Sequence, residues 1–338
     1  MIKPVSFFRF FYIIILAIYH FIYFQLPFDG LRSGFAVVEF FFILSGVFMY
    51  RSFRKKNLSV FDYGIGRFKR FALEVYLWLF ILFLLRTPGL FANHSVSESL
   101  QHILWEVLLL NQVLPLHDSI SSFNAPTWFI GVLLYGGVMV YSFLKLKELG
   151  LKFILPVLVF GGYCFLLHCS PSLEQWSDGH SMIRGVAGLG VGVMLGWYIE
   201  NRPGHSAVLD AVSLVAFPLS VYLMFLDNVN GFLFVVLFSI IIIESFDKES
   251  FYSKIFRSDI WNKLGMLSMP IFIIHFNGPN ALVESVFNIV FPNSHIPTLL
   301  YMSCYLVAVF ILALVYKFVC DRLRKSSLLK HTLLNRSM

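Results

Sequence analysis

Long apolar runs separated by short polar stretches dominate the pattern of the chain. A helix needs about 20 predominantly apolar residues to cross the hydrocarbon core of a bilayer. Runs of about this length are residues 8–27, 34–50, 71–87, 128–144, 152–169, 182–199, 206–226, 229–245, 264–290 and 298–319. The pattern therefore predicts an all-α polytopic membrane protein with about ten transmembrane helices.

A shorter apolar run at 103–114 is interrupted by Glu106 and Asn111. It is too short to span the bilayer and carries a carboxylate near its start. We expect a short re-entrant or interfacial helix there.

The distribution of basic residues orients the predicted spans. With ten spans, 23 of the 26 Lys and Arg residues lie on the side of both termini, and Arg32, Arg86 and Arg184 lie on the other. If 103–114 also crossed, ten would lie on the side of the N-terminus and sixteen opposite. Because cytoplasmic loops are enriched in Lys and Arg, ten spans with both termini cytoplasmic are favoured, and a cytoplasmic tail should start at about residue 320.

Composition supports the membrane class. The chain is 58% hydrophobic and 13% charged, whereas soluble domains carry roughly 25% charged residues. The net charge of +7 follows from the cytoplasmic bias, so nucleic acid is not an expected partner. The four cysteines show neither metal-ligand spacing nor a disulfide framework, so no metal is expected. We expect one transmembrane domain over 1–338.

Two polar residues interrupt the first apolar run. Arg9 and His20 are eleven residues apart, which is close to three helical turns, so both point to one side of the helix at a separation of about 16 Å. Ionisable residues inside a membrane indicate a functional site. The structural alternative is that Arg9 reaches lipid phosphate and His20 bonds a neighbouring carbonyl.

The second run, 34–50, contains a carboxylate and a small-residue pair. Glu39 needs a partner inside the membrane, and His20 or Arg32 is a candidate. Glu39 is therefore a catalytic candidate that would orient His20. Ser45 and Gly46 are more typical of close helix packing.

Arg67 and Arg70 are three residues apart in a basic stretch, 51–70, that precedes the third predicted span. On a helix they would share a face, and paired arginines bind phosphate through bidentate hydrogen bonds. The alternative is a basic anchor at the cytoplasmic surface.

Three further residues are candidates for contacts with a substrate. Trp128 begins a span at the outer interface, although tryptophan is common there. Arg184 enters the outer end of a glycine-rich span, where it could face a polar cavity. His275 is a second intramembrane histidine, and a lone one is more often structural.

Three motifs in the first 70 residues resemble the acyltransferase-3 family of bacterial membrane acyltransferases, which modify surface polysaccharides. They are Arg9 and His20 with ten residues between them, the stretch FFILSG at 41–46, and Arg67-x-x-Arg70. Weaker similarity continues at Trp128, 183–192 and 268–276. The chain departs from the family at its WSLxxE-type motif, of which Trp128 remains and the glutamate is missing.

The resemblance implies an O-acyltransferase that takes acyl-CoA, usually acetyl-CoA and in some members succinyl-CoA, as co-substrate, with no permanently bound cofactor. The acyl group would end on a hydroxyl of a surface polysaccharide or lipid-linked glycan. Arg67, Arg70 and Arg9 would hold CoA phosphates, and His20 would be the general base. A multi-pass protein of the bacterial cytoplasmic (inner) membrane, in contact with membrane lipid, is implied.

Two other classes compete with this interpretation. A flippase or exporter of polysaccharide would need a wide cavity with many charges, and few intramembrane charges occur here. A glycan polymerase usually has a large, basic outer loop, and 88–127 contains no Lys or Arg. Direct transfer and a covalent acyl-histidine intermediate both remain open.

Overall fold

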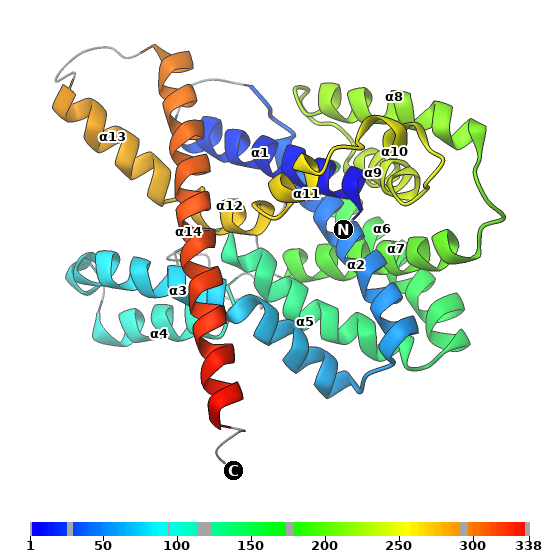
Figure 1. Ribbon diagram of the computed structural model, residues 1–338, viewed down its shortest axis with the longest axis horizontal. Helices are drawn as coiled ribbons and strands as arrows, with labels where there is room; N and C mark the ends of the chain where they lie inside the picture. The colour runs from blue at the N-terminus through cyan, green and yellow to red at the C-terminus, as the bar shows by residue number, and fades with distance from the viewer. Residues whose placement is uncertain are drawn as a thin grey trace.

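The computed structural model describes residues 2–25, 30–93, 95–111, 113, 124–173, 179–290 and 297–334. Within these ranges every regular element is helical (Figure 1). The predicted all-α class is confirmed. The elements are α1 (Lys3–Gln25), η1 (Gly34–Ala36), α2 (Val37–Lys56), α3 (Val60–Asn93), α4 (Val96–Val107), α5 (Thr127–Leu144), η2 (Gly150–Ile154), α6 (Leu155–Cys169), α7 (His180–Asn201), α8 (Ala207–Leu223), α9 (Gly231–Ser245), α10 (Phe251–Ile255), α11 (Ile260–Gly265), α12 (Ser268–Ile274), α13 (Gly278–Val290) and α14 (Thr298–Leu334).

The described helices include several that can cross a membrane. By length and hydropathy there are six, and seven if the α11–α12 segment and α13, which are bent by 73° to each other, count as one span. Helices α8 and α9 are apolar but shorter. The six are Lys3–Tyr23, Gly34–Lys56, Thr127–Leu144, Gly150–Cys169, His180–Asn201 and Thr298–Ser326. These lengths show a multi-pass membrane protein.

The basic stretch 51–70, predicted to precede the third span, lies mostly on α2 and α3, with a short connection between them. Helix α2 continues to Lys56, and α3 begins at Val60. Asn57 ends α2 in the left-handed conformation (φ 41°), and its N–H bonds the carbonyl of Phe53. Arg67 and Arg70 therefore lie on one helix, α3 itself.

The apolar run 264–290, predicted as a single span, is broken in the structure, where its two halves are bent by 73° to each other. Helix α12 ends at Ile274 and α13 begins at Gly278. Pro279 lacks the N–H that would bond the carbonyl of His275 in a continuous helix. That carbonyl instead accepts a hydrogen bond from the hydroxyl of Tyr305 at 2.9 Å.

The short helix expected over 103–114 begins earlier, at Val96. The side chains of Ser95 and Glu98 form a capping box that starts it. Its polar residues Ser99, His102 and Glu106 are buried, whereas Leu100, Leu104 and Val107 are about half exposed. This polarity suits a helix that faces lipid outside and a polar site inside.

Helix α1 crosses the middle of the molecule (Figure 1) and contacts α2, α9, α11, α12 and α14. Helices α2 and α7 pack most closely at Gly46 and Gly192. A Cβ atom on Gly46 would collide with the carbonyl oxygen of Leu189, and one on Gly192 with that of Ile43. The sequence-based assignment of Gly46 to helix packing is confirmed.

Candidate active site

A ladder of polar contacts joins α1 to the α11–α12 segment. The residue numbers of the partners increase together, so α1 and the α11–α12 segment run in the same direction. The contacts are Lys3 Nζ to Asp259 Oδ1 at 2.9 Å, Ser6 Oγ to Asn262 Oδ1 at 3.1 Å, Arg9 Nη2 to Ser268 Oγ at 2.7 Å, and His20 Nδ1 to His275 Nε2 at 2.7 Å. At the exposed end, the hydrogen bond and charge of Lys3 lower the pKa of Asp259 below its ordinary value. Arg9 and His20 thus both face α12.

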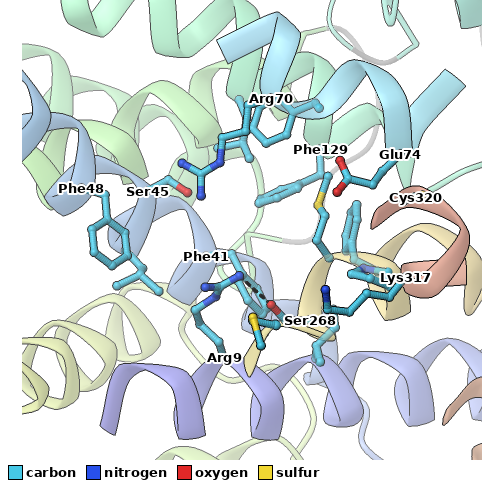
Figure 2. Close-up of a pocket in the computed structure, with 18 of the residues that line it drawn as sticks. Arg9, Phe41, Ser45, Phe48, Arg70, Glu74, Phe129, Ser268, Lys317 and Cys320 are labelled. Carbon is cyan, nitrogen blue, oxygen red and sulfur yellow. Dashed lines mark hydrogen bonds between the residues drawn. The ribbon is translucent and has the colours of Figure 1, made fainter. Parts of the chain in front are cut away.

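A basic cavity of about 470 Å³ lies around Arg9. Cations from α1, α3 and α14 line it, together with apolar residues from α2, α5 and α12. Figure 2 shows the guanidinium groups of Arg9 and Arg70 pointing into this space from opposite sides. Ser45, which belongs to the FFILSG stretch, also lines the cavity. The cationic residues are Arg9, Arg67, Arg70, Lys317 and Arg324.

Two of these cations are neutralised within the protein. Lys317 Nζ lies 2.5 Å from Asp321 Oδ2, and Arg324 Nη2 lies 2.6 Å from Glu74 Oε1. No described carboxylate lies within 4.0 Å of Arg9, Arg67 or Arg70. The three arginines named from the sequence are therefore the positive charges that the cavity leaves for an anion.

Of the three arginines, Arg67 has the strongest structural evidence for a role in binding an anion. Its Nε and Nη2 atoms are buried and have no hydrogen-bond partner among the described residues. Its guanidinium carbon lies 5.9 Å and 5.3 Å from the ring centroids of Tyr63 and Phe71, which hold it in place. Buried donors without partners are costly, so this guanidinium is suited to receive an acceptor from a ligand.

A second cavity, of about 330 Å³, lies at the other end of the ladder. Both His20 and His275 line it. Tyr305 from α14 and Arg86 from α3 also line it. Helices α1, α3 and α14 therefore each contribute to the basic cavity at one position and to the histidine cavity at another.

The two cavities are close along α12. Phe272 lines the basic cavity, and its ring centroid lies 6.1 Å from that of His275, which lines the other. The phenylalanine therefore forms part of the partition between an arginine site and a histidine site.

A polar network that is exposed at Arg86 and buried at Asn124 supports the histidine cavity. Arg86 Nη2 donates to Asn277 Oδ1 at 2.6 Å, and Asn277 Nδ2 donates to Asn124 Oδ1 at 3.3 Å. Asn124, which is fully buried, donates through Nδ2 to the carbonyl of Ile273 at 3.0 Å. The network joins the segment before α5 to the end of α12, immediately beside the histidine pair.

Glu106 closes the same network from α4. Its carboxylate accepts from the backbone N–H of Asn124 at 3.4 Å and from Thr127 Oγ1 at 3.3 Å. Asn124 and Glu106 were not named from the sequence as site residues. Two signals in the sequence could have indicated them. These are the intramembrane carboxylate in the 103–114 run and the polar residue that begins NAPTW at 124.

Glu39 and Arg184 lie together, away from His20. Arg184 Nε donates to Glu39 Oε1, and both side chains are 1% exposed. Tyr163 donates to the other carboxylate oxygen at 3.1 Å. Neither residue lines the basic or the histidine cavity. Arg32, the other partner considered for Glu39, pairs with Asp227.

Trp128 is buried in α5 against aromatic side chains. Its ring centroid lies 6.1 Å from that of Phe42 and 6.1 Å from that of Phe129. Phe129 lines the basic cavity, whereas Trp128 does not.

One group of described residues offers metal-type ligands. Ligand atoms of His205, Glu244 and Asp247 lie within 4.8 Å of one another. Arg202 donates to Glu244 Oε1 at 3.1 Å and lies 2.6 Å from Asp247 Oδ2. The guanidinium thus pairs with one oxygen of each carboxylate that a metal ion would need.

The geometry defines a polytopic helical membrane protein with a basic cavity at one end of its central helix and a histidine pair near the other. The family model described as an acyltransferase domain (acyltransferase-3) matches residues 5–318, nearly the whole chain. The chain belongs to this family of membrane acyltransferases. In comparisons with curated proteins and with solved structures, nothing matches the chain.

Proposed function

We propose that the protein moves an acyl group, most simply acetyl, from cytoplasmic acyl-CoA to a hydroxyl of a surface polysaccharide or lipid-linked glycan outside. In this proposal the chain crosses the inner membrane of a bacterium ten times with both termini in the cytoplasm. The shorter helices α8 and α9, the long α3 and the bent α11–α13 segment would then be spans in addition to the six defined by length.

One observation carries the proposal: Arg9 and His20 lie on the same helix and each lines a different cavity. Their positions differ by about 16 Å along the helix axis at 1.5 Å per residue. An anion-binding site at one end and a base at the other suit a donor with charged and reactive ends.

The basic cavity suits the nucleotide end of acyl-CoA. Arg9, Arg67 and Arg70 have no carboxylate partner among the described residues, and Arg67 has buried donors to satisfy. Arginine binds phosphate through strong, charge-assisted hydrogen bonds. The pantetheine arm would extend past Phe272 and bring the thioester to His20.

The histidine cavity suits the acceptor and the chemistry. The acceptor hydroxyl oxygen attacks the thioester carbonyl carbon, so a C–O bond forms and the C–S bond breaks. His20 takes the hydroxyl proton and returns it to the departing thiolate of CoA. In this proposal the buried side chains of Phe272 and His275 limit the access of water, which would otherwise compete as the acceptor.

The other candidates take supporting roles in this proposal. His275 lies in the acceptor cavity beside His20. Glu39 and Arg184 hold α2 to α7, and Trp128 supports Phe129 at the wall of the donor cavity. A covalent acyl-His20 intermediate is the second route by which the same residues would perform the transfer.

The first experiment tests the base. Cells that lack the gene are complemented with the wild type, His20→Ala or His168→Ala, and surface glycan acylation is measured by mass spectrometry. His168 is exposed at the end of α6 and lines neither cavity, so it is the matched control. We expect loss of acylation with His20→Ala alone, at equal protein levels in the membrane. Unchanged acylation with His20→Ala would overturn the assignment.

The second experiment tests the donor site and separates an acyltransferase from an exporter. Binding of acetyl-CoA to purified protein is compared between the wild type, Arg67→Ala/Arg70→Ala and Lys55→Ala/Lys56→Ala. Lys55 and Lys56 are exposed at the end of α2 and line neither cavity. Charge-assisted hydrogen bonds are worth about 1.5–3 kcal/mol, so we expect a loss of affinity of roughly tenfold or more for the Arg pair alone. An exporter would bind no acetyl-CoA.

A further inference from the structure

We infer that His275 is a positioning residue that fixes the proton of His20 on Nδ1 and thereby makes His20 Nε2 the catalytic base. This inference rests on the proposed function. It assigns to the second histidine a role that is separate from contact with the acceptor.

The proton on His275 is fixed by its own helix. Its Nδ1 lies 2.9 Å from the carbonyl oxygen of Phe272 and 3.1 Å from that of Ile271. Carbonyl oxygens only accept hydrogen bonds, so Nδ1 must carry a hydrogen. The neutral His275 ring therefore has its lone pair on Nε2.

This lone pair sets the tautomer of the partner ring. His275 Nε2 and His20 Nδ1 are 2.7 Å apart, the ring planes differ by 14°, and the centroids are 5.0 Å apart. The two nitrogens thus face each other edge to edge, in the plane of both rings. Because Nε2 of His275 has the lone pair, His20 Nδ1 is the donor. A neutral His20 then holds its own lone pair on Nε2.

The backbone keeps the two rings in register. The hydroxyl of Tyr305 donates to the carbonyl of His275 at 2.9 Å and lies 3.3 Å from the carbonyl of Ala17. His275 is fully buried, and Pro279 leaves its carbonyl available to Tyr305. One hydroxyl from α14 therefore ties α1 to the end of α12 at the position of the pair.

The arrangement also accommodates the charge that forms during transfer. When His20 Nε2 accepts the hydroxyl proton, the ring becomes positive and its Nδ1–H bonds more strongly to His275. Any charge that passes to His275 meets the two carbonyl oxygens at its Nδ1. The proton then leaves His20 Nε2 for the sulfur of CoA, which restores both neutral rings.

The test uses two substitutions of similar size at one position. His275→Gln retains a carbonyl oxygen near the place of Nε2, which can accept from His20 Nδ1. His275→Leu offers no acceptor. Full-length purified protein in proteoliposomes is assayed with acetyl-CoA and glycan from the complemented strain. Because a positioned acid–base group contributes about 10²–10⁴ in rate, we expect His275→Leu to lose about 100-fold or more in kcat. We expect His275→Gln to stay within about tenfold of the wild type, and KM for acetyl-CoA to change in neither.

A spectroscopic readout covers the case in which a variant folds poorly. Solid-state nitrogen NMR of wild-type protein labelled at histidine, with His20 assigned by its loss in His20→Ala, should show the His20 proton on Nδ1. A proton on Nε2, or equal kcat for the Leu and Gln variants, would overturn the inference. Full activity of His20→Ala would overturn the proposed function instead. Full activity of His275→Leu with inactive His20→Ala would overturn this inference alone.

Discussion

Glu39 and Arg184 form an ion pair in the interior of the protein, where α2 meets α7. Each member of the pair makes one further hydrogen bond. Tyr163 donates to Glu39 Oε2 at 3.1 Å, and Arg184 Nη2 donates to the carbonyl of Phe35 at 3.2 Å. Four segments of the chain thus meet at one pair of charges. A buried pair of this kind specifies one arrangement of the helices more than it adds stability.

Removing one charge of this pair should therefore destabilise the protein. We expect Glu39→Leu or Arg184→Met to cost about 3–5 kcal/mol, because each leaves an uncompensated buried charge, and the double variant to recover most of that loss. Thermal unfolding in detergent measures the effect. The control is Arg32→Gln, since Arg32 and Asp227 form a half-exposed pair worth about 1 kcal/mol or less. Single variants as stable as the control would contradict this role.

Phe272 should limit the loss of acyl groups to water. It is 6% exposed and lies between the basic cavity and His275, so Phe272→Ala would open a path between the two cavities. We expect acetyl-CoA hydrolysis without acceptor to rise severalfold and the yield of glycan ester per CoA released to fall. Both products are quantified in one assay. Phe272→Leu, which fills more of the space, is the matched variant and should stay near the wild type.

The arginines of the basic cavity should recognise phosphate and not the thioester. Acetyl-pantetheine carries the thioester without the nucleotide phosphates. We expect the wild type to bind acetyl-CoA more tightly than acetyl-pantetheine, by roughly tenfold or more. Arg9→Gln and the Arg67→Ala/Arg70→Ala variant should reduce this preference while their affinity for acetyl-pantetheine stays unchanged. A preference that survives all three substitutions would place the phosphates elsewhere.

Asn124 should affect transfer to the acceptor and not the binding of acetyl-CoA. Asn124→Ala removes the donor to the Ile273 carbonyl and the acceptor for Asn277, and both are beside the histidine pair. Leaving such buried groups unpaired costs about 1–3 kcal/mol, so we expect transfer to fall about tenfold while acetyl-CoA affinity is unchanged. Asn201→Ala, at the end of α7, is the control. Weaker acetyl-CoA binding by Asn124→Ala would argue against separate donor and acceptor sides.

The local part of the site was predictable from the sequence. The helical period alone places Arg9 and His20 on one side of α1, and the spacing of Arg67 and Arg70 places them on one face. The length of the helix that carries these two arginines was underestimated. The polar residues over 60–70 lower the hydropathy of its first turns, so the predicted span began at 71.

The long-range part was not predictable. His20 and His275 are 255 positions apart, and Glu39 and Arg184 are 145 apart. Nothing in the local pattern indicates that Glu39 prefers Arg184 to His20, because that choice depends on how α2 packs on α7. The kink that brings His275 to His20 had a local signal in Asn277, Gly278 and Pro279, but the apolar residues on both sides of it were combined into one predicted span.

The central claim is that the acyl group crosses the membrane inside this protein. Sealed inverted vesicles from cells that lack the gene, complemented with wild type or His20→Ala, have the cytoplasmic face outside and the acceptor glycan trapped inside. Acetyl-CoA labelled in the acetyl group is added to the outside. The account predicts labelled glycan inside the sealed wild-type vesicles, CoA released outside, and no labelled glycan with His20→Ala. Labelling that requires the vesicles to be opened, so that donor and acceptor meet on one side, would contradict it.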